Sequence, residues 1–255
     1  NIFKNPLINL YTHINIRRAY RYEAKYYNYF DLCHFVSKID ADFVSKFVSR
    51  EKLLVVSNGV DGLDKDLIIP PSINSNKVII VGALVGGNLS YTLRFIDEVW
   101  IKVIKHKPEM ELTIVSRVNP KKIQKYLKKY NIKISNYSGN LALFYQNFGL
   151  VVSPVLKDCG ILNKVLEGMA SGRVVIGYKC SFFGIPEAVN FKEVLSANSS
   201  REMVKLIITA SSKGKELDAI GERSTILATK EYSWNDKILS LADVIQHNVH
   251  IKKHS

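Results

Sequence analysis

The segment Gly160–Gly172, GILNKVLEGMASG, decides the fold of this chain. A short, branched apolar run, Leu150–Val155, comes just before it and is typical of a buried parallel strand. A second such run, Val174–Gly177, follows at once. Between the two strands we expect a turn, a helix and then Gly172, which can close the helix in a left-handed conformation. The segment therefore predicts a βαβ unit.

Two charged residues lie near the start of the predicted helix. The first backbone N–H groups of a helix have no helical partner and carry partial positive charge, so they suit a phosphate. Lys164 would neutralise that phosphate. Glu167, three residues on along the same helix face, would accept hydrogen bonds from a pair of sugar hydroxyls. Taken alone, such a pair is more often a surface ion pair worth about 0.3 kcal/mol.

With its flanking strands, this segment resembles the donor-site segment of the GT-B nucleotide-sugar glycosyltransferases, specifically the large retaining group called glycosyl transferases group 1. That family has a strand ending in a small residue and proline, a glycine turn, Lys-x-x-Glu, a small residue, Met-Ala and a glycine. The counterparts here are Ser153-Pro154, Gly160, Lys164-Val165-Leu166-Glu167, Gly168-Met169-Ala170 and Gly172. The form of residues 160–167 is similar to a subgroup associated with bacterial surface polysaccharides. The resemblance implies that Glu167 binds the nucleotide ribose and that the helix N-terminus faces the diphosphate.

The composition bounds the class of protein. The chain has 255 residues with 47% hydrophobic content, enough for one good core or two small ones. No apolar run approaches the roughly 18 residues of a membrane span, and no secretory signal is visible. Three scattered cysteines fit a reducing compartment and give neither a disulfide framework nor a zinc site. We expect a cytoplasmic protein with no metal and no cofactor, whose donor substrate is a nucleotide sugar.

The net charge of +13 would attract anionic partners. One cluster of cations is mixed with tyrosines, and a second is purely lysine. Their members are Arg17, Arg18, Arg21 and Lys25 with Tyr20, Tyr22, Tyr26, Tyr27 and Tyr29, and Lys121, Lys122, Lys125, Lys128 and Lys129. The lysine cluster predicts a solvated helix face. For the first cluster we favour an ordinary packed helix, with a face at the inner membrane surface as the alternative. No zinc finger or RNA-binding signature accompanies the charge, so we expect no nucleic-acid partner.

Strand and helix patterns alternate over most of the chain. Strands are predicted at residues 78–81, 112–115, 132–135, 150–155, 174–177 and 193–196. Helices are predicted at residues 92–106, 120–130, 141–147, 200–212 and 216–230, with a last one after the N-cap Ser233. This alternation is typical of an α/β fold with a doubly wound parallel, Rossmann-like sheet, whose ligands bind beyond the carboxyl ends of the strands.

The first 50 residues read as helix, strand and helix. In the family this succession ends the acceptor domain, and Tyr22-Glu23 and Ser37–Asp42 match it. The resemblance therefore implies that the chain begins inside that domain and is truncated at its N-terminus. We expect four parts: residues 1–52, a helical remnant of the acceptor domain; 53–71, an interdomain strand and linker; 72–232, the nucleotide-sugar-binding domain; and 233–255, a closing helix and basic tail.

The ends of the predicted strands supply further donor-site candidates. Gly86-Gly87-Asn88 would let the backbone approach a diphosphate, although a Gly-Gly pair is more often a flexible turn. The resemblance places the backbone of Ser135 to Tyr137 along the edge of the base, where Tyr137 would stack, although a half-exposed loop tyrosine without a ligand is commoner. Arg117 is the best rim cation after Lys164. Around the helix start the candidates are Asp158, Gly160, Ile161, Leu162 and Asn163.

Two departures from the family pattern bear on mechanism. Many members carry an acidic residue eight positions before the ribose glutamate, but here that position is Cys159. Asp158, beside it, would substitute or would cap the helix, and we favour the cap. The family's basic pair after the first strand is also missing, so Lys164 and Arg117 would carry more of the charge as leaving-group stabilisers. No catalytic nucleophile is assigned.

We expect a retaining glycosyltransferase that moves a sugar from a nucleotide-diphosphate donor to a glycan or lipid-linked acceptor in surface polysaccharide synthesis. The implied truncation and Cys159 motivate an alternative: a non-catalytic nucleotide-sugar-binding remnant, or one half of a split enzyme whose acceptor domain is a separate chain. A basic binder of membranes or nucleic acid is a third hypothesis, motivated by the net charge alone.

Overall fold

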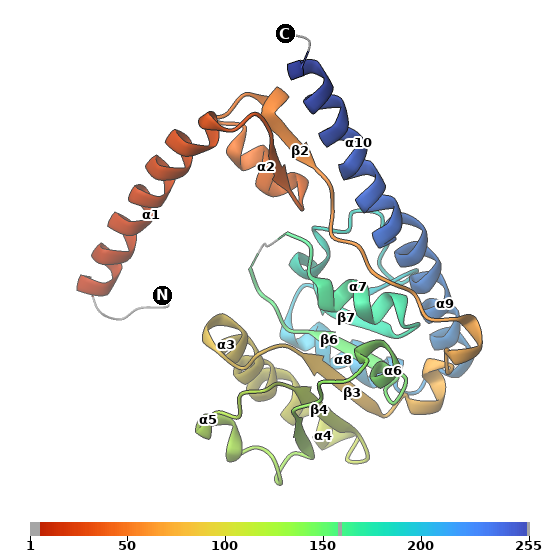
Figure 1. Cartoon of the computed structure of the whole chain (residues 1–255). Helices are drawn as coiled ribbons and strands as arrows, with labels where there is room; N and C mark the ends of the chain where they lie inside the picture. Colours follow the sequence, from red (N-terminus) through yellow and green to blue (C-terminus); the bar gives the residue numbers. More distant parts are fainter. Residues whose placement is uncertain (1–5, 158–159, 254–255) are drawn as a thin grey trace. The chain divides into compact units, whose positions relative to one another are not determined.

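The computed structural model describes residues 6–157 and 160–253, which divide into two compact units (Figure 1). Unit 1 is Asn1–Ser57 and unit 2 is Asn58–Ser255. Unit 1 contains α1 (Pro6–Tyr26), β1 (Cys33–Phe35), α2 (Lys38–Val44) and β2 (Leu53–Val55). The two strands pair in parallel, so β2 belongs to the small sheet of unit 1.

Aromatic rings hold the helices of unit 1 together. Tyr20 of α1 packs edge-on against Phe43 and Phe47, with ring centroids 6.1 and 4.8 Å apart. Ser37 caps α2, because its side chain accepts a hydrogen bond from the Asp40 N–H at 3.2 Å. The predicted order of helix, strand and helix is confirmed in this unit.

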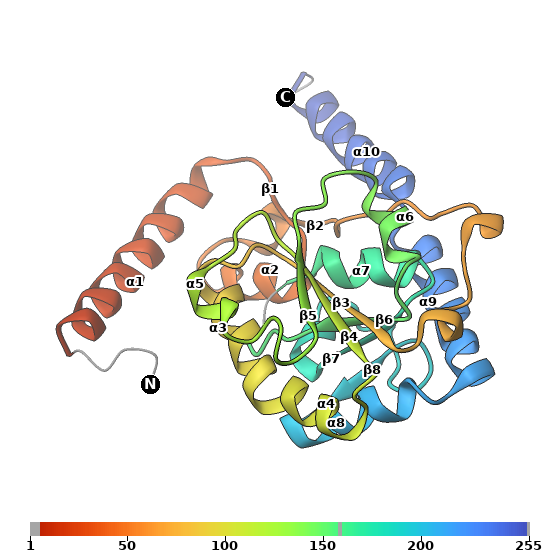
Figure 2. The ribbon, with the colours of Figure 1, turned by 90° about the horizontal axis from the view of Figure 1, so that it is seen from below.

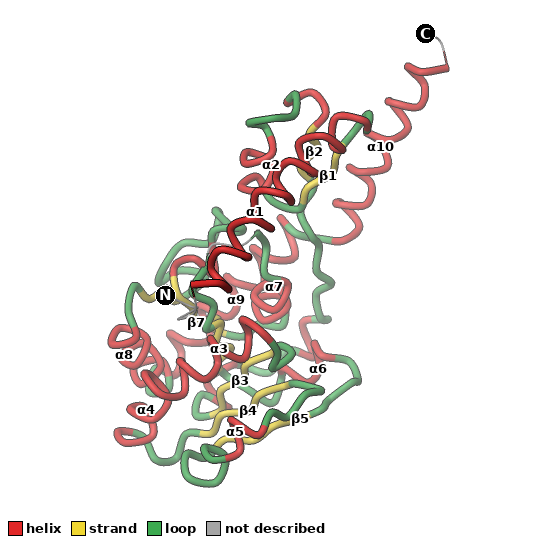
Figure 3. Tube along the Cα trace, turned by 90° about the vertical axis from the view of Figure 1, so that its left-hand side faces the viewer, coloured by secondary structure: helices red, strands yellow, loops and turns green. Residues whose placement is uncertain are grey.

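Unit 2 is built on one sheet of six parallel strands in the order β5-β4-β3-β6-β7-β8. The strands are β3 (Lys77–Val81), β4 (Glu111–Val115), β5 (Ile132–Ser135), β6 (Leu150–Ser153), β7 (Val174–Tyr178) and β8 (Leu195–Ala197). Figure 3 shows β3, β4 and β5 side by side. The predicted doubly wound parallel sheet is confirmed. The strand order reverses between β3 and β6, which pair in parallel.

Helices cover both faces of this sheet (Figure 2). One face carries α3 (Gly86–Phe95), α4 (Ile101–His106), α5 (Lys121–Gln124) and α8 (Ser200–Ala210). The other carries α6 (Leu141–Tyr145) and α7 (Asn163–Ala170). Helix α9 (Gly214–Glu231) contributes to both cores, with Leu217 and Ile220 in the first and Ala228 in the second. Strand residues alternate between the two cores: Val174 and Ile176 of β7 face the first set of helices, and Val175 faces the second. A last helix, α10 (Trp234–Lys253), begins directly after Ser233, as predicted.

Several predicted elements have different bounds in the structure. The helix expected from Thr92 begins at Gly86. Val85 before it is extended, and Gly86 takes a φ of +49°, which a glycine adopts without strain. The segment Gly86-Gly87-Asn88 is therefore the first turn of a helix and not a loop. A π-helical turn, Ile96–Trp100, joins α3 to α4.

The helix predicted over residues 120–130 is regular only over α5. Beyond it the Tyr126 and Leu127 N–H groups donate three residues back, to Ile123 and Gln124, which tightens the chain into turns. The sixth strand starts two residues later than predicted, because Glu193 turns back and its carboxylate accepts a hydrogen bond from the Val189 N–H.

Among the described helices, none combines the length and the apolar character needed to span a bilayer.

Candidate functional site

The site candidates gather where the strand order of unit 2 reverses. Ligands of doubly wound sheets bind beyond the carboxyl ends of the strands at this point. β3 ends at Val81 and leads into Gly82, while β6 ends at Ser153 and leads toward α7. We call the region formed by Gly82, Ser153 and the first turn of α7 the mouth.

Helix α7 is fixed on the sheet by its glycines. Gly168 lies so close to the strands that a Cβ there would meet the side chains of Val151 and Val175 at 3.1 and 3.2 Å. Gly172 ends the helix with a φ of +73°, and the N–H of Arg173 donates to the Gly168 carbonyl at 2.9 Å. The predicted left-handed closure is confirmed, and it is part of a Schellman cap.

The other end of α7 opens toward the mouth. Its N-cap residue, Leu162, makes no side-chain cap bond, and its carbonyl accepts from the N–H groups of Val165 and Leu166. The helix dipole and the N–H groups of the first turn make this end favourable for an anion. Asp158, which we favoured as the cap, lies outside the described residues, and the residue at the N-cap position is Leu162.

Lys164 and Asn88 converge over the end of β3. The Lys164 Nζ lies 3.8 Å from the point that a Cβ on Gly82 would occupy, and the Asn88 Nδ2 lies 3.6 Å from the same point. A cation from α7 and an amide from α3 are thereby brought to the mouth. Gly86 and Gly87 lie exposed in the first turn of α3, and only Asn88 of that predicted trio approaches Lys164.

Glu167 lies one turn deeper in α7 and is half-buried. Burial raises the pKa of its carboxyl group, and a hydrogen bond from the Tyr145 hydroxyl acts in the opposite direction. Tyr145 is fully buried, and burial followed by the Glu167 charge raises its own pKa well above the ordinary value. The carboxylate therefore has a built hydrogen-bond donor behind it, and its remaining lone pairs can accept from a ligand.

A cavity of about 380 Å³ adjoins the mouth on the side of β4 and β5. Its lining includes Gly82, Arg117 and Tyr137, which come from the ends of three neighbouring strands. Arg117 is exposed at its rim. Ser116 shapes one wall, because its hydroxyl oxygen accepts from the Leu84 N–H at 3.0 Å and so ties the loop after β4 to the loop after β3.

Tyr137 is held in place from two sides. Its ring stacks on Phe144 of α6, with centroids 4.2 Å apart and planes 14° apart. Its hydroxyl donates to the Asn140 carbonyl at 3.2 Å, and its N–H donates to the Ser135 hydroxyl oxygen at 3.3 Å. Ser135 thus positions the loop of Tyr137 and does not itself line the cavity.

The remaining candidates form the approach to α7. Asn163 is exposed, and its Oδ1 accepts a hydrogen bond from the Asn58 Nδ2 at 2.8 Å. The backbone of Gly160 and Ile161 passes so close to Gly184 that a Cβ on Gly184 would lie 2.8 Å from the Ile161 Cα. These contacts fix the path of the chain into the helix.

Sequence reasoning missed Tyr145, Phe144 and Asn58 as parts of this site. Tyr145 and Phe144 lie in the short predicted helix 141–147 and look like core aromatics. Only the fold brings one beneath Glu167 and the other against Tyr137. Asn58 lies in the segment Asn58-Gly59-Val60-Asp61, which is typical of a turn, so the sequence alone assigned it no part in the site.

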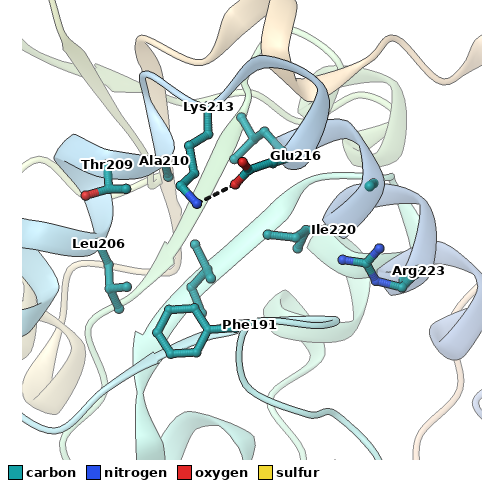
Figure 4. Close-up of a pocket in the computed structure, with 11 residues that line it drawn as sticks. Phe191, Leu206, Thr209, Ala210, Lys213, Glu216, Ile220 and Arg223 are labelled. Atoms are coloured by element: carbon teal, nitrogen blue, oxygen red, sulfur yellow. Dashed lines mark hydrogen bonds and ion pairs between the residues drawn. The ribbon is translucent and has the colours of Figure 1, made fainter.

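Two other cavities in the described part of unit 2 are lined by none of the predicted site residues. The cavity in Figure 4, about 300 Å³, lies between β8, α8 and α9, where Lys213 and Glu216 form an ion pair and Phe191 forms the opposite wall. A second, about 460 Å³, lies between α9 and residues 65–71. Within the described part of the chain, no group of His, Cys, Asp and Glu side chains is arranged to hold a metal ion.

The family model for glycosyl transferases group 1 matches residues 75–213, more than half of the chain, and the match includes Lys164 and Glu167. The chain belongs to this family. No curated protein sequence matches the chain significantly. The family match confirms the resemblance read from the Lys164–Glu167 segment.

Solved structures share the fold. TarM from S. aureus, solved as a G117R mutant with UDP and other ligands, superposes with a TM-score of 0.72 at 14% identity over 89% of this chain and 46% of that one. HepE from Anabaena, in complex with UDP, gives a TM-score of 0.68 at 14% identity over 86% of this chain and 65% of that one. The C-terminal domain of LpcC from Francisella tularensis, a glycosyl transferase group 1 family protein, gives 0.53 at 18% identity over 68% of this chain and 100% of that one.

These likenesses establish a GT-B architecture for the sheet and its helices. The chain spans 46% of the length of TarM and 65% of the length of HepE. It spans the whole of the LpcC C-terminal domain.

Proposed function

We propose that unit 2 binds the nucleotide-diphosphate sugar donor of a glycosyltransferase at the mouth. The observation that carries the proposal is the pairing of Lys164, over the end of β3, with Glu167 one turn deeper in the same helix. A diphosphate at the first turn of α7 would meet the helix N–H groups and the Lys164 ammonium. The Glu167 carboxylate would accept hydrogen bonds from the two ribose hydroxyls.

The base of the nucleotide fits the cavity beside the mouth. Its lining supplies the Tyr137 ring and the Arg117 guanidinium, together with the Gly82 backbone. Uracil is the base to test first, because the TarM and HepE structures both contain UDP. In this arrangement Tyr137, backed by Phe144, offers its other ring face for stacking.

The proposed chemistry is transfer with retention at the anomeric carbon. The bond between that carbon and the β-phosphate oxygen breaks, and its electron pair goes to the phosphate. The acceptor hydroxyl oxygen forms the new bond, and its proton passes to the departing diphosphate. Lys164, Arg117 and the N–H groups of α7 would stabilise the growing negative charge, which requires no protein nucleophile.

The acceptor is proposed to be a glycan or a lipid-linked glycan, bound by groups outside unit 2, in unit 1 or in further polypeptide. Unit 1 offers a surface for a membrane-bound acceptor. Arg17, Arg18, Arg21 and Lys25 of α1 are exposed, and Leu10 and Ile14 precede them at helical spacing with 59% and 46% exposure. A face of cations, aliphatic residues and tyrosines suits an anionic bilayer surface. For this cluster the sequence favoured an ordinary packed helix. In the structure Tyr20 of α1 packs against Phe47, and the cations of α1 are exposed.

Donor hydrolysis and transfer test the enzymatic proposal. The chain is incubated with UDP-glucose and with UDP-N-acetylglucosamine, and released UDP is measured with and without membrane extract as a source of acceptor. Release of UDP that is lost when Lys164 is substituted supports the proposal. Absence of any release, together with UDP binding, would favour the second candidate below.

Sedimentation with phosphatidylglycerol vesicles, with and without Arg17, Arg18 and Arg21 changed to glutamine, tests the membrane surface.

A binding module without catalysis is the second candidate. It is favoured by position 159, which is a cysteine where many relatives carry an acidic residue near the donor sugar. Such a module would bind nucleoside diphosphates as proposed for the enzyme and release no UDP from either sugar donor. Adding a separately produced acceptor domain would restore activity if this chain is one part of a split enzyme, and would not do so for an inert remnant.

A further inference from the structure

A buried tyrosine stands behind the proposed ribose carboxylate. Tyr145 is the last residue of α6 and has no exposed surface. Its hydroxyl lies 3.5 Å from the Lys164 carbonyl oxygen and within hydrogen-bonding reach of the Glu167 carboxylate. One hydroxyl group therefore contacts α7 at the two residues assigned to the diphosphate and the ribose.

Helix α6 is fixed at both of its ends, and the contact at its C-terminal end ties it to α7. Asn140 caps it, because its Oδ1 accepts from the Leu143 N–H at 3.2 Å. The next residue after Tyr145 is Gln146, whose Nε2 donates to the Ser171 carbonyl at the C-cap of α7, 2.9 Å away. Tyr145 and Gln146, the last residue of α6 and its C-cap, thus contact α7 near its start and at its C-cap, so the Tyr145 hydroxyl has little freedom to move away from Glu167.

The surroundings of Glu167 make this hydroxyl significant. Below α7, the strands present the apolar side chains of Val151 and Val175, and α9 contributes the neutral Thr225, which donates to the Met169 carbonyl. Lys164 lies on the same helix, toward the mouth. Among the described residues, Tyr145 is the titratable side chain that acts on the carboxyl group of Glu167.

We propose that Tyr145 is a positioning residue, whose hydroxyl holds the Glu167 carboxylate in the orientation that accepts both ribose hydroxyls. The inference rests on the proposed donor site. A carboxylate with one oxygen fixed by a buried donor presents its other lone pairs in a defined direction, which lowers the cost of ordering it when ribose binds. The alternative is that Glu167 and Lys164 merely satisfy a buried tyrosine hydroxyl without any consequence for ligands.

The test measures UDP affinity by calorimetry from pH 5 to pH 8.5 for the 255-residue chain and for Tyr145→Phe. Phenylalanine keeps the ring and its packing. We expect UDP to bind about tenfold more weakly to the variant at pH 7, because a hydrogen bond to a charged group is lost. As the pH is lowered, the affinity of the variant for UDP should begin to fall at a higher pH than that of the unchanged chain. The reason is that the loss of the Tyr145 hydrogen bond raises the pKa of Glu167 further.

Two further variants sharpen the result. Tyr126→Phe is the matched control, because Tyr126 is also buried and hydrogen-bonds a carboxylate, that of Asp97, but lies on the other face of the sheet. It should leave UDP affinity unchanged. In a Glu167→Gln background, adding Tyr145→Phe should cost much less affinity than it does alone. Wild-type affinity and an unshifted pH profile for Tyr145→Phe would overturn the proposal.

If the unchanged chain does not bind UDP, the proposed function fails, and thermal unfolding still tests the contact. Burial raises the folded-state pKa of Glu167, so its ionisation costs stability as pH rises through that pKa. Without the Tyr145 hydrogen bond, this ionisation costs more stability. Tyr145→Phe should therefore lower the melting temperature, relative to wild type, more at pH 8 than at pH 4. An equal loss at both pH values would mean that the hydroxyl does not act on the carboxylate.

Discussion

Lys164 differs from the other cations of the chain in its place in the fold. In sequence it is one of 36 lysines and arginines in a chain of net charge +13. In the structure its ammonium lies at the end of β3, beside Gly82 and Asn88, at the point where the strand order reverses. Bulk charge attracts any anion, whereas a cation at a helix N-terminus over a strand end selects a phosphate group of defined position.

Lys164→Gln should weaken UDP binding by about tenfold or more, because one charge-assisted hydrogen bond to the diphosphate is lost. Uridine, which has no phosphate, should bind the variant and the unchanged chain equally. Lys122→Gln, at an exposed lysine of α5, is the control and should change neither affinity. Equal weakening of UDP and uridine by Lys164→Gln would mean that Lys164 does not contact the diphosphate.

At the scale of the element, α7 depends on its glycines as much as on its charged residues. Gly168 lets the helix lie close to β6 and β7, and Gly172 reverses the chain into β7. The close approach at Gly168 and the turn at Gly172 together fix the axis of α7, and so the direction in which the backbone N–H groups of its first turn point.

Gly172→Ala should destabilise the chain by about 2 kcal/mol. The φ of +73° strains any residue with a Cβ, and that Cβ would lie 2.6 Å from the Ile68 Cγ2. Gly214→Ala is the control at the start of α9, where no atom lies within 4 Å and the φ is ordinary. It should leave stability unchanged or raise it by up to about 1 kcal/mol. Urea unfolding measures both, and equal stabilities for the two variants would contradict this account of the cap.

At the scale of the whole molecule, unit 2 contains a buried cation, Arg173, which follows the end of α7, whereas the proposed ligand site is at the start of α7. Arg173 has no exposed surface and donates to the carbonyls of Ser171, Phe148 and Ile69. Burial lowers its pKa to about 10, and the charge of Asp218 opposes that effect. The side chain joins the segment before β3, the start of β6 and the end of α7.

Arg173→Met should destabilise the chain by about 3 kcal/mol or more, because three carbonyls lose their donor in the interior. Arg201→Met changes an exposed arginine of α8 and should cost less than about 0.5 kcal/mol. Chemical denaturation followed by circular dichroism distinguishes them. A cost for Arg173→Met no greater than that of the control would show that these hydrogen bonds add little to folding.

Much of the fold could be predicted from periodicity alone. Runs such as Val78–Val81 and Val174–Gly177 indicated buried parallel strands, and all six predicted strands occur in the sheet. The start of α3 could not be predicted, because paired glycines are as compatible with a turn as with a helix start. For the site, the Lys164–Glu167 spacing was readable from the sequence. The donor behind Glu167 was not, because Tyr145 is 22 residues earlier and meets Glu167 only through packing.

The central claim is that α7 binds a nucleoside diphosphate at its first turn through Lys164, and the ribose of that nucleotide one turn deeper through Glu167. Calorimetric titration of UDP into the unchanged chain and into Glu167→Ala tests it most directly, with 2′,3′-dideoxyuridine diphosphate as the matched ligand. We predict that the substitution weakens UDP binding by about tenfold to a hundredfold, since hydrogen bonds to a charged carboxylate are lost. The dideoxy ligand, which lacks both hydroxyls, should bind both proteins alike. UDP affinity that is the same with and without the Glu167 carboxylate would contradict the account.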